Sequence, residues 1–340
     1  MKKIIIDCRY LGMSGIGRFL EGILNNFDFD KYDTYLLGKK EKIEAWNNCK
    51  YIYDDTSPYS FSSILKNKNK KLINQCDTFL TPNFILPYWV KIKSVCVLHD
   101  IIFLDMKEVN KNFLETILKK KLLKRCVKHA SKIFTVSNFS KDRIIYHFKK
   151  SKDKIIVSYP GVSDNFKNYN KINEKENYVV FIGNIKKNKG LFSLVNALQY
   201  LNNNTKICIV GDEKGFKNGD KAVIDIINNN KDIYFTGRIR DDEMLDIISK
   251  AKFLIQPSLY EGFGLPPLEA LYLGTKPIIS DIEVFKEVYS DLPVEFFKLN
   301  DSKDLADHIN NSDTNFDFDK DLANSKYSSL NCAKKIMEEL

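Results

Sequence analysis

Two glutamates, Glu261 and Glu269, stand eight positions apart in the segment LYEGFGLPPLEALYLGTKPI, residues 259–278. Carboxylates with this spacing can accept hydrogen bonds from sugar hydroxyl groups at two separate points. The turn between them carries backbone N–H groups that can converge on an anion. The pattern indicates a site for a ligand with both hydroxyl groups and negative charge; the alternative is that both glutamates are surface caps of a helix. The N–H groups belong to Phe263, Gly264 and Leu265.

The apolar run FLIQPS, residues 253–258, precedes this segment directly and has the composition of a buried strand. Glu261 is therefore expected in the loop at the carboxyl end of that strand. Proline is favoured at the first helical position, so Pro266 or Pro267 is expected to open a helix that has Glu269 in its first turns. Ligands bind at the carboxyl ends of parallel strands in open α/β sheets, which makes this loop the leading candidate site.

A second candidate site is RYLGMSGIGR, residues 9–18, which follows the first apolar run of the chain. Gly12, Gly15 and Gly17 stand there between an expected strand at 3–7 and an expected helix at 18–26. Glycines at such a turn let backbone N–H groups approach an anion, and the helix N-terminus adds a favourable dipole. The spacing is neither G-x-G-x-x-G nor G-K-[ST], which excludes a dinucleotide fingerprint and a Walker loop. The alternative is a tight turn that needs a positive φ angle.

Short β-rich runs alternate with helical stretches along the whole chain. Such alternation predicts mostly parallel sheets with helices on both faces, and two blocks of it predict two doubly wound domains. A polar, turn-rich segment without periodicity at 160–177 separates the blocks, so we expect domains at 1–165 and 166–325 and a closing helix at 326–340. The expected strands are 3–7, 34–37, 50–53, 77–80, 94–98, 132–136 and 154–159, then 178–183, 206–211, 232–237 and 253–258.

Composition restricts the class of protein. The chain has 340 residues, of which 44% are hydrophobic and 29% charged, values that exclude collagen, coiled coil and wholesale disorder. No apolar run approaches the roughly 18 residues that cross a bilayer. The seven cysteines are odd in number and contain no C-x-x-C pair, so we expect reduced, buried thiols in a cytoplasmic protein.

Positive charge is concentrated in the first half of the chain. Residues 1–160 carry 30 Lys and Arg against 16 Asp and Glu, whereas the remainder carries 23 against 28. Part of the excess lies in KNFLETILKKKLLKRCVKHASK, residues 111–132, where lysines surround an expected apolar helix face. One interpretation is a face that attracts an anionic partner, which is either a lipid or a phosphorylated acceptor. The alternative is the solvated side of an ordinary packed helix. The expected apolar face consists of Phe113, Ile117, Leu118, Leu122 and Val127.

Several motifs, in their order along the chain, resemble those of retaining glycosyltransferases with the GT-B fold, in particular the mannosyltransferase-like (group 1) members of glycosyltransferase family 4. E-G-F-G-x-P-x-x-E at 261–269 is similar to the family's E-x7-E signature. GIGR at 15–18 resembles its N-terminal glycine loop, VLHDIIF at 97–103 its "HD" strand end, and TVSNFSK at 135–141 its "S-x-x-S" turn. FIGNIKKNKGL at 181–191 resembles the segment that opens the second domain. The resemblance implies two Rossmann-like doubly wound domains that face a central cleft.

The resemblance also implies roles for individual residues of the second domain. Glu261 would contact the hydroxyl groups of the donor sugar, Glu269 would hold the nucleotide ribose, and Lys189 would neutralise the leaving diphosphate. Backbone N–H groups would bind the sugar and phosphate, and those groups belong to Phe263, Gly264 and Leu265.

Further roles fall on both domains. Gly15 and Gly17 would bring the first domain's loop against the phosphates or the acceptor, and His99 would face the sugar. The alternative for His99 is a packed imidazole bonded to backbone. Arg238 would lie near the base or the diphosphate. The resemblance implies that Gly183 and the residue after it belong to a loop that binds the diphosphate; the family often has arginine at that next position, where this chain has Asn184.

The activity implied is transfer of a hexose or deoxyhexose, with mannose from a GDP donor favoured, in polysaccharide or lipopolysaccharide biosynthesis. The partners are a nucleotide-diphosphate sugar donor and a glycan or lipid-linked saccharide acceptor, with peripheral contact to an anionic membrane and no nucleic acid. No cofactor and no required metal are expected. Two D-x-D pairs, Asp28–Asp30 and Asp317–Asp319, stand away from the strand-end loops and are not expected to bind metal.

Three other functions remain as alternatives. A GT-B nucleotide-sugar epimerase would share the fold, and the E-x7-E pattern argues against it. A non-catalytic sugar-nucleotide-binding protein would not need intact Glu261, Glu269, Lys189 and His99. A nucleic-acid binder would explain the basic first half, but the sequence contains no RNA or DNA module and no series of stacking aromatics.

Overall fold

The computed structural model describes residues 1–340 except 111, 171, 173, 203, 212–220 and 238. Contacts within the chain divide it into two compact units. The N-terminal unit contains Met1–Gly161 and Lys326–Leu340, and the C-terminal unit contains Val162–Ser325. The division falls after Gly161, whereas the sequence predicted a boundary after residue 165. The closing segment, Lys326–Leu340, is part of the N-terminal unit.

The N-terminal unit is built on a parallel sheet of seven strands in the order β3-β2-β1-β4-β5-β6-β7. The chain winds outward from β1 to β3, returns to β4 beside β1, and then winds the other way to β7. The direction therefore reverses between β1 and β4, which is where ligands bind in doubly wound sheets. The strands are β1 (Lys3–Asp7), β2 (Asp33–Gly38), β3 (Lys50–Tyr53), β4 (Thr78–Thr81), β5 (Lys93–Leu98), β6 (Lys132–Thr135) and β7 (Ile155–Val157).

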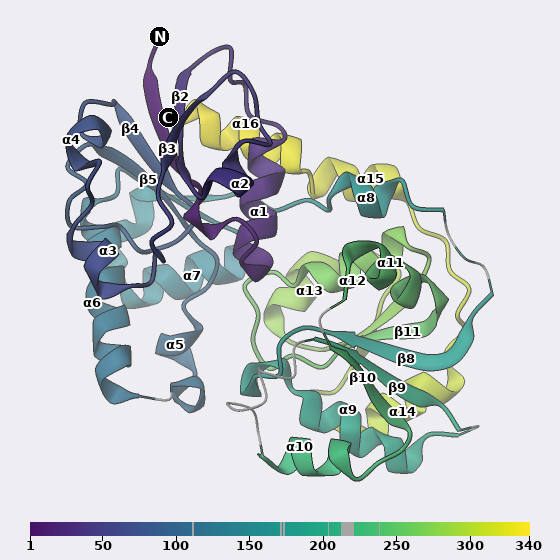
Figure 1. The fold of residues 1–340 in the computed structure, drawn as a ribbon. Helices are drawn as coiled ribbons and strands as arrows, with labels where there is room; N and C mark the ends of the chain where they lie inside the picture. Colours follow the sequence, from purple (N-terminus) through teal and green to yellow (C-terminus); the bar gives the residue numbers. More distant parts are fainter. Residues whose placement is uncertain (111, 171, 173, 203, 212–220, 238) are drawn as a thin grey trace. The chain divides into compact units, whose positions relative to one another are not determined.

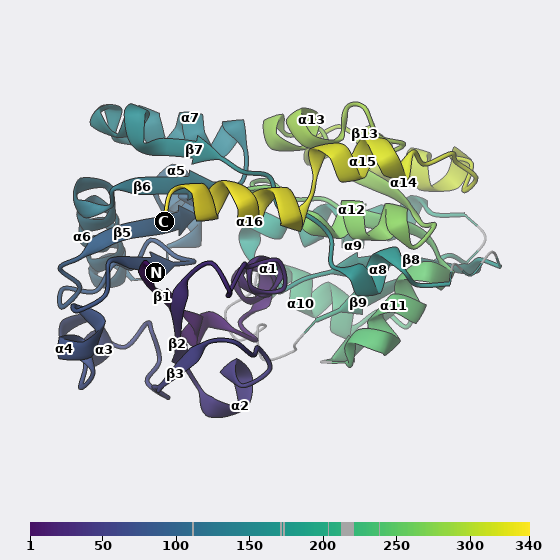
Figure 2. The same cartoon turned by 90° about the horizontal axis from the view of Figure 1, so that it is seen from above.

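Helices cover this sheet, and the final helix returns to it from the far end of the chain. Figure 1 and Figure 2 both show α16, in yellow, within the N-terminal unit. The chain end is held by Thr78 Oγ1, which donates to the Leu340 carbonyl at 3.1 Å, and by Lys93 Nζ, which donates to the Glu339 carbonyl at 2.7 Å. The helices are α1 (Ser14–Leu24), α2 (Lys40–Ile43), α3 (Phe61–Leu65), α4 (Lys70–Ile73), α5 (Ile102–Asp105), α6 (Phe113–His129), α7 (Asn138–His147) and α16 (Ser329–Glu338).

The C-terminal unit repeats the plan with six parallel strands in the order β10-β9-β8-β11-β12-β13. Its direction reverses between β8 and β11. Strands buried on both faces read as nearly continuous apolar runs, and KICIV in β9 and FLIQ at the end of β11 have this character. The strands are β8 (Glu176–Ile182), β9 (Lys206–Val210), β10 (Ile233–Gly237), β11 (Ala251–Gln256), β12 (Lys276–Ser280) and β13 (Glu295–Phe297).

Two helical layers enclose the second sheet. Figure 1 shows α11, α12 and α13 on one face and α9, α10 and α14 on the other. The apolar core on one side includes Val179, Ile207, Phe253 and Ile278. The helices of this unit are α8 (Asp164–Lys167), α9 (Leu191–Ala197), α10 (Lys221–Asn228), α11 (Asp241–Lys250), α12 (Leu265–Tyr272), α13 (Glu283–Tyr289), α14 (Ser302–Asn311) and α15 (Lys320–Lys326), the last reaching one residue beyond the unit.

The expected alternation of strands and helices is confirmed, with two differences in detail. Eleven strands were expected, and β12 and β13 were missed, because β12 begins at KPI, the end of the segment that contains the two glutamates, and β13 has only three residues. In the described parts of the chain, no helix combines the length and the apolar character that a membrane span needs.

The expected apolar face of α6 is wrong in its first half. Among the described residues, the buried side chains of the helix lie in its second half, where Leu123 and Cys126 pack in the core beside the sheet and Leu122 packs with Ile64 and Ile85. At the start of the helix, Phe113 is 79% exposed and Leu114 is 72% exposed. The first half of α6 therefore presents apolar side chains to solvent among its lysines.

Candidate functional site

Two loops at the carboxyl ends of β8 and β11 are packed together at the point where the second sheet reverses direction. The Leu259 N–H donates to the Asn188 carbonyl at 2.8 Å, and Asn188 Nδ2 donates to the Tyr260 carbonyl at 3.3 Å. Gly190 has a φ angle of +60°, and a Cβ atom there would lie 1.8 Å from the Pro257 carbonyl oxygen. Only glycine allows this approach, so Gly190 determines how closely the Lys189 loop sits against the Glu261 loop.

This packing brings Lys189 and Glu261 together. Lys189 Nζ lies 2.5 Å from Glu261 Oε1, and the two side chains are 22% and 11% exposed. Ser258 Oγ donates to the same oxygen at 2.7 Å, and Gln256 Nε2 lies 3.3 Å from it. Both groups belong to one sheet edge although they are distant in the sequence, so the edge offers a cation and a carboxylate to one ligand.

Helix α12 begins directly after this loop, as the sequence predicted. Gly264 has a φ angle of +83° at the N-cap, and a Cβ atom there would lie 2.6 Å from the Phe285 ring. Glu269, in the second turn of the eight-residue helix, is only 2% exposed. A buried carboxylate is not a surface cap, so that alternative is wrong for Glu269.

The expected anion-binding N–H groups lie at the start of α12. Phe263 is 5% exposed, and its ring centroid is 6.5 Å from that of Tyr289. The Tyr289 hydroxyl donates to the Gly264 carbonyl. These contacts direct the carbonyl of the turn toward protein, while the first N–H groups of a helix have no acceptor within the helix. Leu265, partly exposed, is the first residue of the helix.

The loop after β8 contains two further predicted residues. Gly183 has a φ angle of +143°, and its N–H donates to the Val210 carbonyl at 3.0 Å. Asn184 is exposed. Arg238, which was expected near the base or the diphosphate, lies outside the described residues.

In the N-terminal unit, the glycine motif lies inside a helix rather than before it. Helix α1 begins at Ser14, four residues earlier than expected, so Gly15 and Gly17 belong to its first turns. A Cβ atom on Gly17 would lie 2.9 Å from the backbone of both Tyr10 and Gly12, whereas one on Gly15 would meet nothing within 4 Å. Gly17 is therefore needed for packing, and Gly15 leaves the helix N-terminus open.

His99 follows β5 at the same sheet edge and contacts α1. Its ring meets the Phe19 ring edge-on with centroids 4.9 Å apart, and Nε2 lies 3.0 Å from the Pro82 carbonyl. Burial lowers the pKa of His99 to about 4, although the bond to Pro82 acts in the opposite direction. The imidazole is therefore neutral at pH 7 and donates through Nε2, which leaves Nδ1 as an acceptor.

Two groups of buried polar residues at these sheet edges were not predicted from the sequence. Arg9 forms a bidentate pair with Asp7, with two N–O distances of 2.8 Å, and lies 3.6 Å from Asp54. Burial disfavours the charge of Arg9, but the neighbouring Asp7 reverses this effect and raises its pKa. Gln256 and Ser258, the polar residues that bond to Glu261, were also missed. A glutamine in an otherwise apolar strand was the available signal.

The two D-x-D pairs have structural contacts. Asp28 accepts from the Lys31 N–H at 3.1 Å, Asp30 accepts from Asn48 at 3.2 Å, and Asp319 accepts from two N–H groups at the start of α15. Within the described ranges, no three His, Cys, Asp or Glu side chains come together as a metal site.

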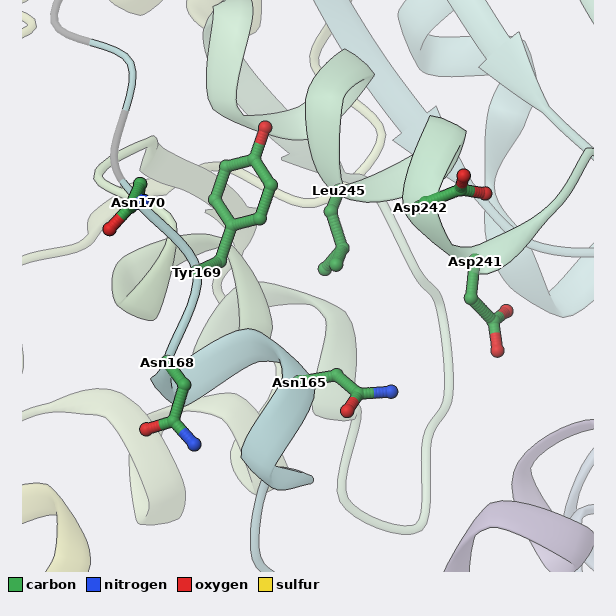
Figure 3. Close-up of a pocket in the computed structure, with 7 residues that line it drawn as sticks. All are labelled: Asn165, Asn168, Tyr169, Asn170, Asp241, Asp242 and Leu245. Atoms are coloured by element: carbon green, nitrogen blue, oxygen red, sulfur yellow. The ribbon is translucent and has the colours of Figure 1, made fainter.

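A shallow hollow of about 500 Å³ lies between α8 and α11, away from the residues described above. Figure 3 shows amide, carboxylate and tyrosine side chains around it. Its lining contains none of the predicted site residues; it consists of Asn165, Asn168, Tyr169, Asn170, Asp241, Asp242 and Leu245.

Residues 162–327 match the family model described as "Glycosyl transferases group 1". The match spans the C-terminal unit from end to end, including the loops of Lys189 and Glu261. The C-terminal unit is therefore a group 1 glycosyltransferase domain.

The names of two curated relatives agree with this assignment. The chain is 31% identical over 181 residues, or 53% of its length, to the O-antigen chain mannosyltransferase RfbU of Salmonella typhimurium. It is 26% identical over 226 residues, or 62% of its length, to the O-antigen chain mannosyltransferase B of Escherichia coli. The matches span 50% and 58% of these relatives' own lengths.

Among solved structures, Anabaena Alr3699/HepE in complex with UDP and glucose matches with a TM-score of 0.73. The match covers 100% of this chain and 99% of that one at 15% sequence identity, so it shows the fold alone. The expected fold class, two Rossmann-like parallel-sheet domains of the GT-B type, is confirmed.

Proposed function

We propose that the protein is a glycosyltransferase that moves a hexose or deoxyhexose from a nucleotide-diphosphate sugar to a glycan or lipid-linked saccharide acceptor. The observation that carries the proposal is the pairing of Lys189 and Glu261, 2.5 Å apart, at the reversal point of the second sheet. The group 1 domain supports transfer of a sugar, and the names of two relatives favour mannose and the building of a surface polysaccharide.

The charges at this edge suit the reaction. Breaking the bond between the anomeric carbon and the phosphate oxygen places positive charge on the sugar ring and negative charge on the diphosphate. Lys189 and the N–H groups at the start of α12 would stabilise the diphosphate, and a well-placed donor of this kind contributes about 3–4 kcal/mol. Fixed donors supply this stabilisation without a metal ion, and we propose a metal-independent enzyme.

Glu261 and Glu269 would bind the donor rather than react with it. Glu261 Oε1 already accepts from Lys189 and Ser258, so Oε2 is the oxygen available to a sugar hydroxyl. Glu269 would hold the ribose. We propose a retaining, front-face transfer, in which the acceptor oxygen bonds to the anomeric carbon as the phosphate leaves and takes the acceptor's proton. A covalent sugar adduct on Glu261 would contradict this route.

His99 would act on the sugar as a neutral hydrogen-bonding group. Its Nε2 is occupied by the Pro82 carbonyl, and its pKa of about 4 keeps the ring uncharged near pH 7. The ring can therefore accept a hydrogen bond from a hydroxyl group at Nδ1 but does not supply a proton at neutral pH.

The test is a thermal-shift screen of GDP, UDP, dTDP and ADP sugars, followed by turnover with saccharide acceptors. We expect a GDP sugar to raise Tm, because a ligand bound only to the folded state stabilises it. We expect nucleoside diphosphate release to rise when acceptor is added. Interconversion of two nucleotide sugars would instead identify an epimerase, and binding without turnover would identify a binding protein.

We also propose that the first half of α6 contacts an anionic membrane that carries the acceptor. Phe113 and Leu114 are largely exposed, and Lys119, Lys120 and Lys121 follow them on the same helix. Exposed apolar side chains beside lysines are complementary to the interface of anionic lipid bilayers.

Vesicles with and without anionic lipid test this contact. We expect binding to anionic vesicles at low salt and release at high salt, because the ionic part of the attraction is screened. Phe113→Ser with Leu114→Ser should weaken binding at every salt concentration, whereas neutralising Lys119, Lys120 and Lys121 should weaken it chiefly at low salt. Equal retention on neutral vesicles, or no retention at all, would contradict the proposal.

A further inference from the structure

The hydrogen bonds on Glu261 meet on only one of its two oxygens. Oε1 accepts from Lys189 Nζ at 2.5 Å and Ser258 Oγ at 2.7 Å, with Gln256 Nε2 at 3.3 Å. Among the residues that the structure describes, none is bonded to Oε2. The carboxylate is thus fixed by hydrogen bonds to Oε1, and Oε2 is available to a ligand.

The chemistry of the groups determines where their hydrogens lie. An ionised carboxylate only accepts, so Ser258 must donate its single hydroxyl hydrogen to Glu261. The Ser258 oxygen then accepts from Gln256 Nε2, 2.8 Å away. The NH₂ group of Gln256 must therefore face Glu261 and Ser258, and its orientation cannot be reversed without placing two acceptors together.

This arrangement is costly for Gln256. Its side chain is fully buried, and its Oε1 has no hydrogen-bond partner within the described part of the chain. A buried carbonyl without a partner destabilises the folded state, and an apolar residue at the end of β11 would avoid that loss. A buried polar group without a hydrogen-bond partner is unfavourable for stability, and such exceptions are typical of functional positions.

The backbone of Ser258 is itself fixed by a hydrogen bond from the neighbouring strand. Its side chain is fully buried, and its backbone carbonyl accepts from Ser280 Oγ, at the end of β12, at 2.5 Å. The neighbouring strand therefore fixes the Ser258 backbone, Ser258 and Gln256 fix Glu261, and little freedom remains for the carboxylate. Preorganisation of this kind is what a group needs if it is to discriminate between sugars.

We propose that Ser258 and Gln256 are positioning residues that aim Glu261 Oε2 at one hydroxyl group of the donor sugar. The inference rests on the proposed function and deepens it: sugar discrimination would depend on two buried side chains that do not touch the donor. Lys189 bonds to the same oxygen of Glu261 directly, so its contact with the diphosphate does not require Ser258 or Gln256.

The experiment compares Ser258→Ala with wild type on the full donor and on a panel of monodeoxy donors. We expect kcat/KM for the full donor to fall about 10- to 100-fold, as for loss of one hydrogen bond to a charged group. With the donor that lacks the hydroxyl bound by Glu261, we expect wild type and variant to agree within about twofold, because that bond is already absent. Affinity for the free nucleoside diphosphate should not change.

Gln256→Met gives an independent measurement. The variant should lose about tenfold in kcat/KM for the full donor while its Tm is equal to or above that of wild type, because the buried carbonyl is removed. Ser249→Ala is the matched control, since Ser249 is also a fully buried serine of this unit but bonds to Leu273 and Ile172 instead. It should retain wild-type discrimination.

The outcomes separate the two proposals. Equal losses of Ser258→Ala on every donor would show general damage to packing and would overturn the positioning role. Full activity of both variants would overturn it as well, while leaving sugar transfer intact. A wild-type protein that transfers no sugar from any donor would overturn the proposed function, and this inference with it.

Discussion

The carboxyl edges of the two sheets share a topology but use their charged groups differently. In the N-terminal unit, Arg9 is 4% exposed and is paired with Asp7 and Asp54 inside the protein, and His99 at the same edge is neutral. In the C-terminal unit, Lys189 and Glu261 are partly exposed, and one oxygen of Glu261 is open.

If the proposed function is correct, the same position in a doubly wound sheet serves architecture in one unit and ligand binding in the other. The first edge offers a helix N-terminus at Gly15 and an uncharged imidazole at His99, which suits hydroxyl groups. The second edge offers a cation and a carboxylate, which suit a sugar joined to a diphosphate. We therefore expect substitutions at the first edge to act mainly on stability and those at the second mainly on activity.

Arg9→Leu should have the largest effect on stability. Removing the guanidinium leaves Asp7 and Asp54 as buried carboxylates without their cation, which costs about 3–5 kcal/mol of unfolding free energy. Urea unfolding followed by circular dichroism measures the loss. Arg240→Leu is the control in the other unit, because Arg240 is paired with Asp242 at 74% exposure and should change stability by less than about 1 kcal/mol. Equal effects would remove the contrast between the edges.

Lys189→Met should have the largest effect on activity. Loss of one preorganised donor to the leaving diphosphate should reduce kcat by about 100- to 1000-fold. Steady-state turnover with the identified donor measures it, and Lys231→Met, an exposed lysine at another place in the unit, should retain wild-type turnover. A Lys189 variant with normal kcat would place the diphosphate elsewhere.

His99 should make stability depend on pH in a defined window. The unfolded histidine binds a proton below its ordinary pKa of 6.5, whereas the folded one resists protonation until about pH 4. Between these values the unfolded state holds more protons, so unfolding free energy falls as pH decreases from 6.5 to 4, by about 1–3 kcal/mol from this group.

Above pH 6.5 both states of His99 are neutral and the group contributes no pH dependence. His99→Gln keeps a donor toward the Pro82 carbonyl but does not titrate, so its stability should fall less steeply over the same window. Denaturant unfolding at pH 7, 6, 5 and 4.5 for both proteins checks the difference. Parallel curves would show that His99 titrates normally in the folded state.

The glycines of α1 should give the smallest effects and the sharpest contrast within one edge. Gly17→Ala should cost about 1–3 kcal/mol, because its Cβ would press against two backbone segments. Gly15→Ala should leave stability unchanged or raise it by up to about 1 kcal/mol, since the position is helical and open. A loss of turnover in Gly15→Ala at full stability would show that a ligand approaches there, and equal destabilisation by the two substitutions would contradict the packing difference.

Much of the fold could be predicted from the sequence, because strands buried on both faces leave long apolar runs such as KIIID and KICIV. The two missed strands had no such signal: β13 is three residues long, and β12 begins with a lysine and a proline. The early start of α1 was missed because glycines, which are poor helix formers, fill its first turn.

The candidate site divides in the same way. The spacing of Glu261 and Glu269 places one in a strand-end loop and the other in the following helix, and both positions are local enough to be predicted. The hydrogen bonds from Ser258 and Gln256 to a single oxygen of Glu261 were not predictable, because they depend on side-chain directions at the end of a buried strand.

The sequence by itself determined that this chain alternates strand and helix in two blocks and that its carboxylates follow strand ends, since both are matters of local pattern. Only the tertiary structure decided that Lys189 meets Glu261, because the strands that carry them are neighbours in the sheet but far apart in the chain. Gly190, pressed against the Pro257 carbonyl, completes that approach, and no local pattern encodes the distance between two loops.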